Sequence, residues 1–591
     1  MVQAFVDKLG ALFQGEAKWY KLPKLLGLVR LVLIRNELRE KNLHDTEDGP
    51  LTGPPCDGAN TGVRMLDGTC NDLASTRMGA AGTRFGRNFP LEHVWPDEKR
   101  LLSPSPRKVS LDLMTREAFQ PATILNLTAA SWIQFMTHDW FNHGLDKSGK
   151  RVIEVPLDPG DPWPEHPMRV PRTPLDPTRS ADSPKPPTFV NEVTHWWDAS
   201  QIYGIDPTTA IKRRTGTDGK IWVGPDGKLP LDPELGVDLT GFNDNWWIGL
   251  SMLHGLFALE HNAICEPLKA EYRHLSDEEI YGLARLINAA LLAKIHTVEW
   301  TPAILPHPVI TKAMEINWSG LAGDELQDVL EVLDDSEILG GIVGSKVDHH
   351  TAPYSLTEEF VSVYRLHALM PDEICFRSLK DDTVLQTRSL AEVSGKRTRA
   401  VLDQLSMADL FYSFGVAYPG AVRLHNYPRT LQNLKRDNGE IFDLAAVDIL
   451  RDRERGVPRY NQFRRLLHLA PVATFKELSD KPEWAAQIRA VYNDDIESVD
   501  LMVGLYAEPL PDGFGFSETA FRIFVLMASR RLKSDRFFTD DYRPEIYTEA
   551  GLDWIRRNDM GSVIKRHFPE LGAALAGVKN AFAPWRRVSP S

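Results

Sequence analysis

The sequence predicts a mainly α-helical protein with few short strands. Apolar residues recur at the three-to-four spacing of amphipathic helices in seven segments: residues 121–143, 246–274, 277–300, 355–369, 401–414, 482–506 and 517–533. Of the 591 residues, 42% are hydrophobic and 25% are charged, which is ordinary for a soluble globular protein with a large core. The sequence shows no internal repeat, so we expect one large helical unit rather than a repeat array.

Changes in composition along the chain suggest how it is organised. Residues 20–41 mix Leu, Val and Ile with Lys and Arg at near-helical spacing, as in a helix that packs on the main body or lies on a membrane surface. We divide the chain into an N-terminal helical segment, 1–45, and a single domain, 46–591. Residues 43–110 and 158–177 are rich in Gly, Pro, Asp and Asn, which predicts irregular excursions over the surface.

Charge and cysteine content exclude several classes of protein. A formal net charge of -13, without an offsetting basic stripe, disfavours nucleic-acid binding. The four cysteines, Cys56, Cys70, Cys265 and Cys375, are sparse and form no CxxC pair, so we expect neither a disulfide framework nor a zinc cluster, and a reducing compartment. Without a secretory signal or an apolar run near the ~20 residues of a spanning helix, we predict a cytoplasmic protein, with peripheral membrane contact as an option.

The segment SWIQFMTHDWFNHG carries three polar residues in an apolar helix: Gln134, His138 and Asp139. Gln134 and His138, four apart, share one face, and Asp139 lies about 100° away. A histidine with a glutamine one turn earlier can shuttle protons beside a bound oxidant, whereas the alternative is a core histidine satisfied by its neighbour. His138, Asp139 and His143 also suggest a phosphohydrolase of the HD type, which would leave Gln134 unexplained.

The segment EVTHWWDASQIYG places four residues at alternate positions: Thr194, Trp196, Asp198 and Ser200. In an extended backbone their side chains would point to one side. Hydroxyl, carboxylate and main-chain oxygens are the ligands that calcium accepts, and Asp139 would add a second carboxylate. The alternative is a half-buried strand whose polar residues face water.

The segment SLTEEFVSVYRLHALMPD predicts a helix with Ser355 and Glu358 as a capping box. Within it, Tyr364 and His367 lie one turn apart. A neutral imidazole on an apolar helix is a good axial ligand for haem iron, and a phenol one turn away could contact the same porphyrin. The alternative is a tyrosine and a histidine packed in a core.

The segment AKIHTVEWTPAIL places His296 and Thr301 five residues apart. Joined by an arginine, such a pair suits a carboxylate, which guanidinium binds in a two-pronged geometry. The adjacent Arg530 and Arg531 are one source of that arginine. Taken singly, each of these residues is more often a surface or capping residue.

Together these motifs resemble the haem peroxidase and cyclooxygenase superfamily, and within it the fatty acid α-dioxygenases. The resemblance extends from DGTCNDL (67–73) through RDRERGVPRYNQFRR (451–465) to SETAFRIFVLMASRRLKSDRFF (517–538). It implies the helical fold shared by cyclooxygenases and myeloperoxidase. It also implies haem b, which is not attached covalently, and calcium as cofactors. For the haem, the resemblance implies Gln134 and His138 on the distal side, His367 as the proximal ligand and Tyr364 as the radical residue. The implied calcium ligands are Asp139, Thr194, Trp196, Asp198 and Ser200, and the implied carboxylate clamp is His296, Thr301 and Arg531, with Arg530 as the alternative arginine.

The activity implied is oxygenation of a long-chain fatty acid. A peroxide activates the haem, a radical at Tyr364 takes hydrogen from C2 of the substrate, and O2 adds there to give a 2-hydroperoxy fatty acid. One alternative is a haem peroxidase that oxidises small donors with hydrogen peroxide, and another is a haem- and calcium-binding adhesion or structural module without catalysis.

Two features bear on how the haem would be held. Trp246 and Trp247 stand about where halide-oxidising relatives carry residues that attach haem covalently, and the stretch GFNDNWWIGLSMLHGLFAL lacks their arginine. We therefore expect non-covalent haem and no halide oxidation. The asparagine that supports the proximal histidine in the family corresponds to Asn426 or Asn433.

Overall fold

The computed structural model is mainly helical, as the sequence predicts. It describes residues 18–146, 148–180, 182–320, 337 and 340–588. The α-helices in this part of the chain are α2 (Lys24–Lys41), α3 (Gly58–Thr61), α4 (Pro106–Val109), α5 (Leu127–Trp140), α6 (Ser200–Tyr203), α7 (Pro207–Arg213), α8 (Ile248–Glu271), α9 (Asp277–Ile295), α10 (Thr301–Ile304), α11 (Pro308–Ser319), α13 (Glu358–Val363), α14 (Thr398–Leu402), α15 (Met407–Val416), α16 (Arg429–Gln432), α17 (Leu444–Glu454), α18 (Tyr460–Leu466), α19 (Phe475–Leu478), α20 (Pro482–Val491), α21 (Leu501–Ala507), α22 (Glu518–Lys533), α23 (Pro544–Tyr547), α24 (Glu549–Arg557) and α25 (Met560–His567).

The strands of the described residues form three separate antiparallel pairs. They are β1 (Val152–Val155) with β2 (Met168–Pro171), β3 (Glu373–Arg377) with β4 (Val384–Ser389), and β5 (Leu434–Lys435) with β6 (Ile441–Phe442). Few, short strands are what the sequence predicts. The Pro-rich stretch 158–177 is less irregular than expected, because β2 lies inside it and buries Met168 and Val170 against β1.

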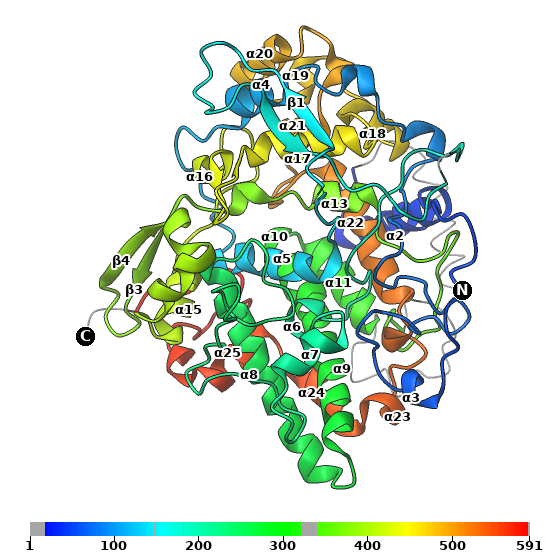
Figure 1. The fold of residues 1–591 in the computed structure, drawn as a ribbon, viewed down its shortest axis with the longest axis vertical. Helices are drawn as coiled ribbons and strands as arrows, with labels where there is room; N and C mark the ends of the chain where they lie inside the picture. The colour runs from blue at the N-terminus through cyan, green and yellow to red at the C-terminus, as the bar shows by residue number, and fades with distance from the viewer. Residues whose placement is uncertain (1–17, 147, 181, 321–336, 338–339, 589–591) are drawn as a thin grey trace.

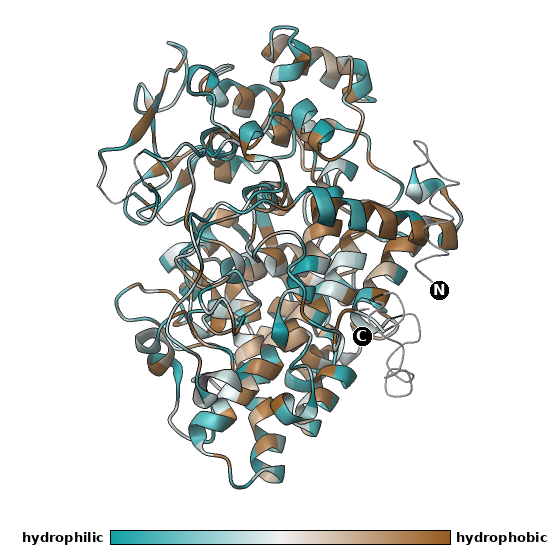
Figure 2. Cartoon of the chain, turned by 90° about the vertical axis from the view of Figure 1, so that its right-hand side faces the viewer, coloured by the Kyte–Doolittle hydropathy of each residue, from teal (hydrophilic) through white to brown (hydrophobic). Residues whose placement is uncertain are grey.

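Helix α5 lies in the middle of the molecule, with α8 and α9 running below it and α13 and α22 on its other side (Figure 1). The Asn126 side chain caps α5 by accepting the backbone N–H of Ala129 at 3.3 Å. Gly249 lets α8 approach α5 closely, because a Cβ there would lie 2.5 Å from Ser131 Oγ. Most helices carry both hydrophobic and hydrophilic residues, and their apolar sides form one large core (Figure 2).

Helix α2 packs on α11 and α22. Trp19, just before it, is buried, and a Cβ at Gly27 would lie 3.0 Å from Val309 of α11. Leu25 is 65% exposed. None of the helices in the described residues is long and apolar enough to cross a membrane. Residues 1–17 lie outside the described part, so the division at residue 45 and the membrane contact stay predictions.

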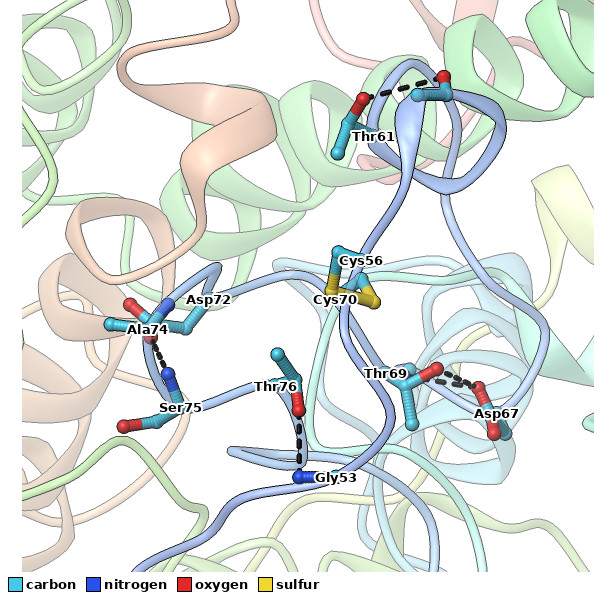
Figure 3. Close-up of a disulfide and its surroundings, with 12 residues drawn as sticks. Gly53, Cys56, Thr61, Asp67, Thr69, Cys70, Asp72, Ala74, Ser75 and Thr76 are labelled. Atoms are coloured by element: carbon cyan, nitrogen blue, oxygen red, sulfur yellow. Dashed lines mark hydrogen bonds between the residues drawn. A yellow bond between two sulfur atoms is a disulfide. The ribbon is translucent and has the colours of Figure 1, made fainter.

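The cysteine prediction is wrong in one respect. Cys56 and Cys70 form a disulfide that closes a loop of the irregular segment after α2 (Figure 3). The spacing of 14 residues gave no sign of it, because the irregular chain brings the two Cα atoms to 5.9 Å. Cys265 and Cys375 are free. The inference from cysteine spacing to a reducing compartment therefore loses its basis.

Two of the predicted helical segments each divide into two α-helices. The segment 482–506 divides into α20 and α21, because Asn493 and Asp494 adopt left-handed backbone angles, with φ of 51° and 63°. The segment 401–414 begins instead as α14 and continues as α15 after Ser406, whose side chain caps α15. Periodicity alone does not show these breaks, because the apolar spacing continues across them.

Candidate active site

Gln134 and His138 lie on one face of α5, which is partly accessible. Both side chains keep accessible surface, whereas Phe135, Met136 and Asp139 beside them are buried. Burial lowers the pKa of His138 to about 4, so the imidazole is neutral near pH 7. Its Nδ1 has no hydrogen-bond partner among the described residues. A neutral imidazole of this kind can accept a proton from a bound oxidant.

The predicted helix around Tyr364 is shorter than expected. Thr357, rather than Ser355 with Glu358, caps α13 by accepting the backbone N–H of Phe360 at 3.2 Å. Tyr364 directly follows the last residue of α13, and His367 begins a separate 3₁₀ turn. The two residues are therefore not on one continuous helix, and the capping-box prediction is wrong.

The His367 imidazole is held by a buried carboxylate. Its Nδ1 lies 2.7 Å from Asp448 Oδ2 of α17, while Tyr427 and Arg365 bind the same carboxylate at 2.9 Å each. Burial raises the pKa of Asp448, but His367 and Arg365 outweigh it and hold the pKa below its usual value. A carboxylate only accepts, so Nδ1 donates to Asp448, and Nε2 is the ring nitrogen left to bind a metal.

Neither asparagine predicted to support His367 contacts it. Asn426 binds Arg116 and the backbone around Gln120, and Asn433 donates to the carbonyl of Arg429. The prediction is wrong because it assumed an amide side chain, whereas the hydrogen-bond partner of His367 Nδ1 is the carboxylate of Asp448. The signal available in the sequence was an acidic residue inside the otherwise apolar start of α17.

Tyr364 packs in an aromatic cage. Its ring stacks on Phe524 of α22 at 4.5 Å and meets Phe360 and Trp140 at 4.6 and 5.3 Å between ring centroids. No other described residue forms a hydrogen bond with its hydroxyl. Burial raises the pKa of Tyr364, so the phenol keeps its proton.

A π-helical turn brings His296 and Thr301 together. In an α-helix, residues five apart point about 140° away from each other, but residues 296–300 form the wider i→i+5 turn. Thr301 Oγ1 and its backbone N–H both donate to the His296 carbonyl, Oγ1 at 2.9 Å. Trp132 Nε1 donates to His296 Nδ1 at 3.2 Å. Because indole N–H only donates, the neutral ring carries its proton on Nε2 and can donate it.

The two adjacent arginines have different surroundings. Arg530 donates to the carbonyls of Ala352, Pro353 and Ser355. Arg531, 1% exposed, lies between the rings of Trp140 and Trp197 at 4.1 and 3.9 Å, with the ring of Phe360 further out at 5.5 Å. Its Nε and one Nη lack hydrogen-bond partners, and none of the described carboxylates lies within salt-bridge distance. A buried, unpaired cation is costly, so this position favours an anionic ligand.

Trp140 joins these groups into one site. Besides Arg531 and Tyr364, it contacts His296, whose ring centroid lies 5.0 Å away. Phe524, whose ring stacks on Tyr364, lies seven residues before Arg531, so the two share one face of α22. The structure thus brings the predicted clamp and the predicted radical residue to one place.

Four of the five residues predicted to bind calcium also come together: Asp139, Thr194, Asp198 and Ser200. Asp139 Oδ1 accepts the backbone N–H of Ser200 at 2.5 Å, and burial together with the charge of Asp198 raises the pKa of Asp139 to about 7. Three buried oxygens have no hydrogen-bond partner among the described residues: Thr194 Oγ1, Asp198 Oδ2 and Ser200 Oγ. Two facing carboxylates and unpaired oxygens fit a hard cation.

The backbone around these oxygens differs from the prediction. Residues 191–199 form bends rather than an extended strand, and Ser200 already begins α6. The Trp196 ring stacks on Tyr354 and donates to two carbonyls, so only the carbonyl of Trp196 is left to bind a cation. Arg64 already pairs with one oxygen of Asp198 at 3.2 Å.

The HD-type arrangement does not form. His143 pairs with Glu358 at 3.0 Å and stacks on Phe85, away from the Asp139 contacts. Within the described ranges, no three His, Cys, Asp or Glu side chains are grouped to hold a metal ion. The proposed calcium ligands include hydroxyl and carbonyl oxygens, which such a group does not count. The finding therefore speaks against the phosphohydrolase alternative and does not test the calcium site.

Comparison with known proteins identifies the family. The animal haem peroxidase family matches residues 63–579. An α-dioxygenase 2 of Arabidopsis thaliana is 39% identical over 98% of this chain and 92% of its own. The chain belongs to the animal haem peroxidase family, among the α-dioxygenases. A solved fatty acid α-dioxygenase of Oryza sativa with palmitic acid superposes with a TM-score of 0.91 at 36% identity, over 99% of this chain and 97% of that one.

The site residues fit the cofactor of a haem peroxidase. His367 offers Nε2 because Asp448 uses Nδ1, and its side chain keeps 36% of its accessible surface. Gln134 and His138 likewise keep an accessible face on α5. The peroxidase A of Dictyostelium discoideum, 18% identical with a TM-score of 0.69, shares the fold alone.

Proposed function

We propose that this chain oxygenates long-chain fatty acids at C2, with haem as cofactor. The observation that carries the proposal is the buried guanidinium of Arg531, which has no acidic partner among the described residues and contacts the same tryptophan as Tyr364. A carboxylate bound there would neutralise the charge and leave the adjacent carbon beside the phenol.

His367, His138 and Tyr364 would each have a distinct role around the haem. His367 would bind the iron through Nε2, with Asp448 fixing its ring. His138 would take and return a proton from a hydroperoxide activator, since its imidazole is neutral. Haem, when bound, supplies the one-electron oxidation that converts the phenol of Tyr364 into a phenoxyl radical.

The protein residues then determine where oxygen is added. His296 Nε2–H and the Arg531 guanidinium would hold the carboxylate, and Thr301 would exchange its backbone acceptor for the same group. The Tyr364 radical takes a hydrogen atom from C2, O2 adds to the carbon radical, and the resulting peroxyl radical takes the hydrogen atom back from Tyr364. The product is a 2-hydroperoxy fatty acid.

The direct test is oxidation of palmitate by the haem-loaded protein. We expect oxygen uptake and a 2-hydroperoxy acid by mass spectrometry, with no product from protein without haem. Guaiacol oxidation with hydrogen peroxide, measured in parallel, addresses the peroxidase alternative. Vigorous guaiacol oxidation with no oxygen uptake on palmitate would favour that alternative instead.

We also propose that Asp139, Asp198, Thr194, Ser200 and the carbonyl of Trp196 bind calcium. A dication would satisfy the unpaired oxygens and offset the repulsion between the two carboxylates. It would also tie α5 to the start of α6, next to His138.

Calcium removal should lower the melting temperature by several degrees, because a ligand bound only to the folded state stabilises it. Chelation with EGTA followed by thermal unfolding measures this, and added calcium should restore the original value. Ser200→Ala provides the sharpest control. Since Ser200 Oγ has no hydrogen-bond partner by geometry among the described residues, its removal should change the melting temperature much more when calcium is bound than after chelation. An unchanged melting temperature on chelation would refute the site.

A further inference from the structure

The segment just before α8 holds the Gln134 carboxamide at both ends. Trp247 Nε1–H donates to Gln134 Oε1 at 2.8 Å, and Gln134 Nε2 donates to the carbonyl of Asn245 at 3.2 Å. An indole nitrogen can only donate, so the amide atom it faces must be the oxygen. The orientation of the carboxamide is therefore fixed by residues more than one hundred positions further along the chain.

The Trp247 indole itself is fixed by its packing. The side chain is buried, and its ring lies 5.7 Å from that of Phe414 in α15. Its backbone pairs with Ser394 in an isolated bridge. A Cβ at Gly249 would lie 2.5 Å from the indole, so this glycine makes room for the ring. The packing therefore fixes the position of the Trp247 indole N–H relative to α5.

One hydrogen of the Gln134 carboxamide has no acceptor among the described residues. Gln134 Nε2 has two hydrogens, of which the Asn245 carbonyl accepts one. Gln134 and His138 share the accessible face of α5. The second hydrogen has no hydrogen-bond partner among the described residues, so it is available to a ligand.

We propose that Trp247 is a positioning residue for the distal pocket: it orients the Gln134 carboxamide so that one N–H serves a ligand bound beside His138. The inference rests on haem binding next to His138, as proposed above. It also assigns a use to one of the two tryptophans, Trp246 and Trp247, that we expect about where halide-oxidising relatives attach haem covalently. Without its indole donor, the carboxamide can turn or flip and present oxygen instead of N–H.

Trp246 offers a matched control in the neighbouring position. It is equally buried, but its Nε1 donates to Ser251 Oγ at 3.0 Å and its ring packs on His254. Trp246→Phe therefore removes an indole donor and the same ring area without touching Gln134. Any effect confined to Trp247→Phe reports on the carboxamide rather than on lost packing.

The experiment measures ligand binding in haem-loaded protein rather than turnover. We expect Trp247→Phe to weaken cyanide binding by about five-fold, the change that corresponds to one ordinary hydrogen bond, and to shift the C–O stretching band of the carbonyl complex. Trp246→Phe should match the unmodified protein. In a Gln134→Leu background, Trp247→Phe should have no further effect on either readout.

Specific outcomes overturn the inference. One is equal cyanide affinity and an equal C–O band in Trp247→Phe and Trp246→Phe. Another is a further loss in the Gln134→Leu background. If Trp247→Phe does not fold, benzothienylalanine at position 247 removes only the N–H and keeps the ring shape. A protein that shows no Soret band would refute the haem-based function itself, whereas normal haem with unchanged cyanide binding refutes only the role of Trp247.

Discussion

Tyr364→Phe is expected to reduce oxygenation of palmitate to the level of a protein-free control while haem stays bound. Phenylalanine keeps the ring packing on Phe524, Phe360 and Trp140, so the fold should be preserved. It lacks the O–H that gives and takes back the hydrogen atom in the proposed reaction. An oxygen electrode measures the uptake, and the Soret band measures the haem.

Tyr281→Phe is the matched control for this experiment. The Tyr281 hydroxyl is also buried, has no hydrogen-bond partner among the described residues and lies outside the site. Its removal should leave oxygen uptake unchanged. Normal turnover in Tyr364→Phe would eliminate the radical step from the mechanism.

The second large effect is expected for Arg531→Met. The variant keeps much of the side-chain volume between Trp140 and Trp197 but removes the charge. Loss of a charge-assisted contact of roughly 1.5 to 3 kcal/mol should raise the apparent KM for palmitate by about ten- to a hundred-fold. The same substitution removes a buried unpaired cation, so it should not lower the melting temperature much.

The ratio of acid to ester turnover isolates the clamp from general damage. The unmodified protein should use palmitate and reject methyl palmitate, and Arg531→Met should lose this preference. Arg530→Lys, which weakens contacts with the carbonyls of residues 352, 353 and 355, should affect stability but keep the preference. Equal turnover of acid and ester by the unmodified protein would contradict a carboxylate clamp at Arg531.

The sequence by itself determined the helical class and most of the candidate site residues. Helix periodicity is a local property, so the spacing of Gln134 and His138 places both on one face of α5 before any tertiary contact is known. The residue types also carry chemistry of their own, since only certain side chains shuttle protons, bind a carboxylate or yield a radical. The resemblance carried by the motifs then joined the separate segments into one function.

Only the tertiary structure decided which partner each of these residues has. Asp448 reaches His367 from 81 positions away, and Trp132 reaches His296 from 164. The same holds for the choice between two neighbouring arginines, since a rotation of about 100° per residue turns one toward carbonyls and the other toward tryptophans. Such contacts depend on how distant segments pack, and local spacing carries no record of that packing.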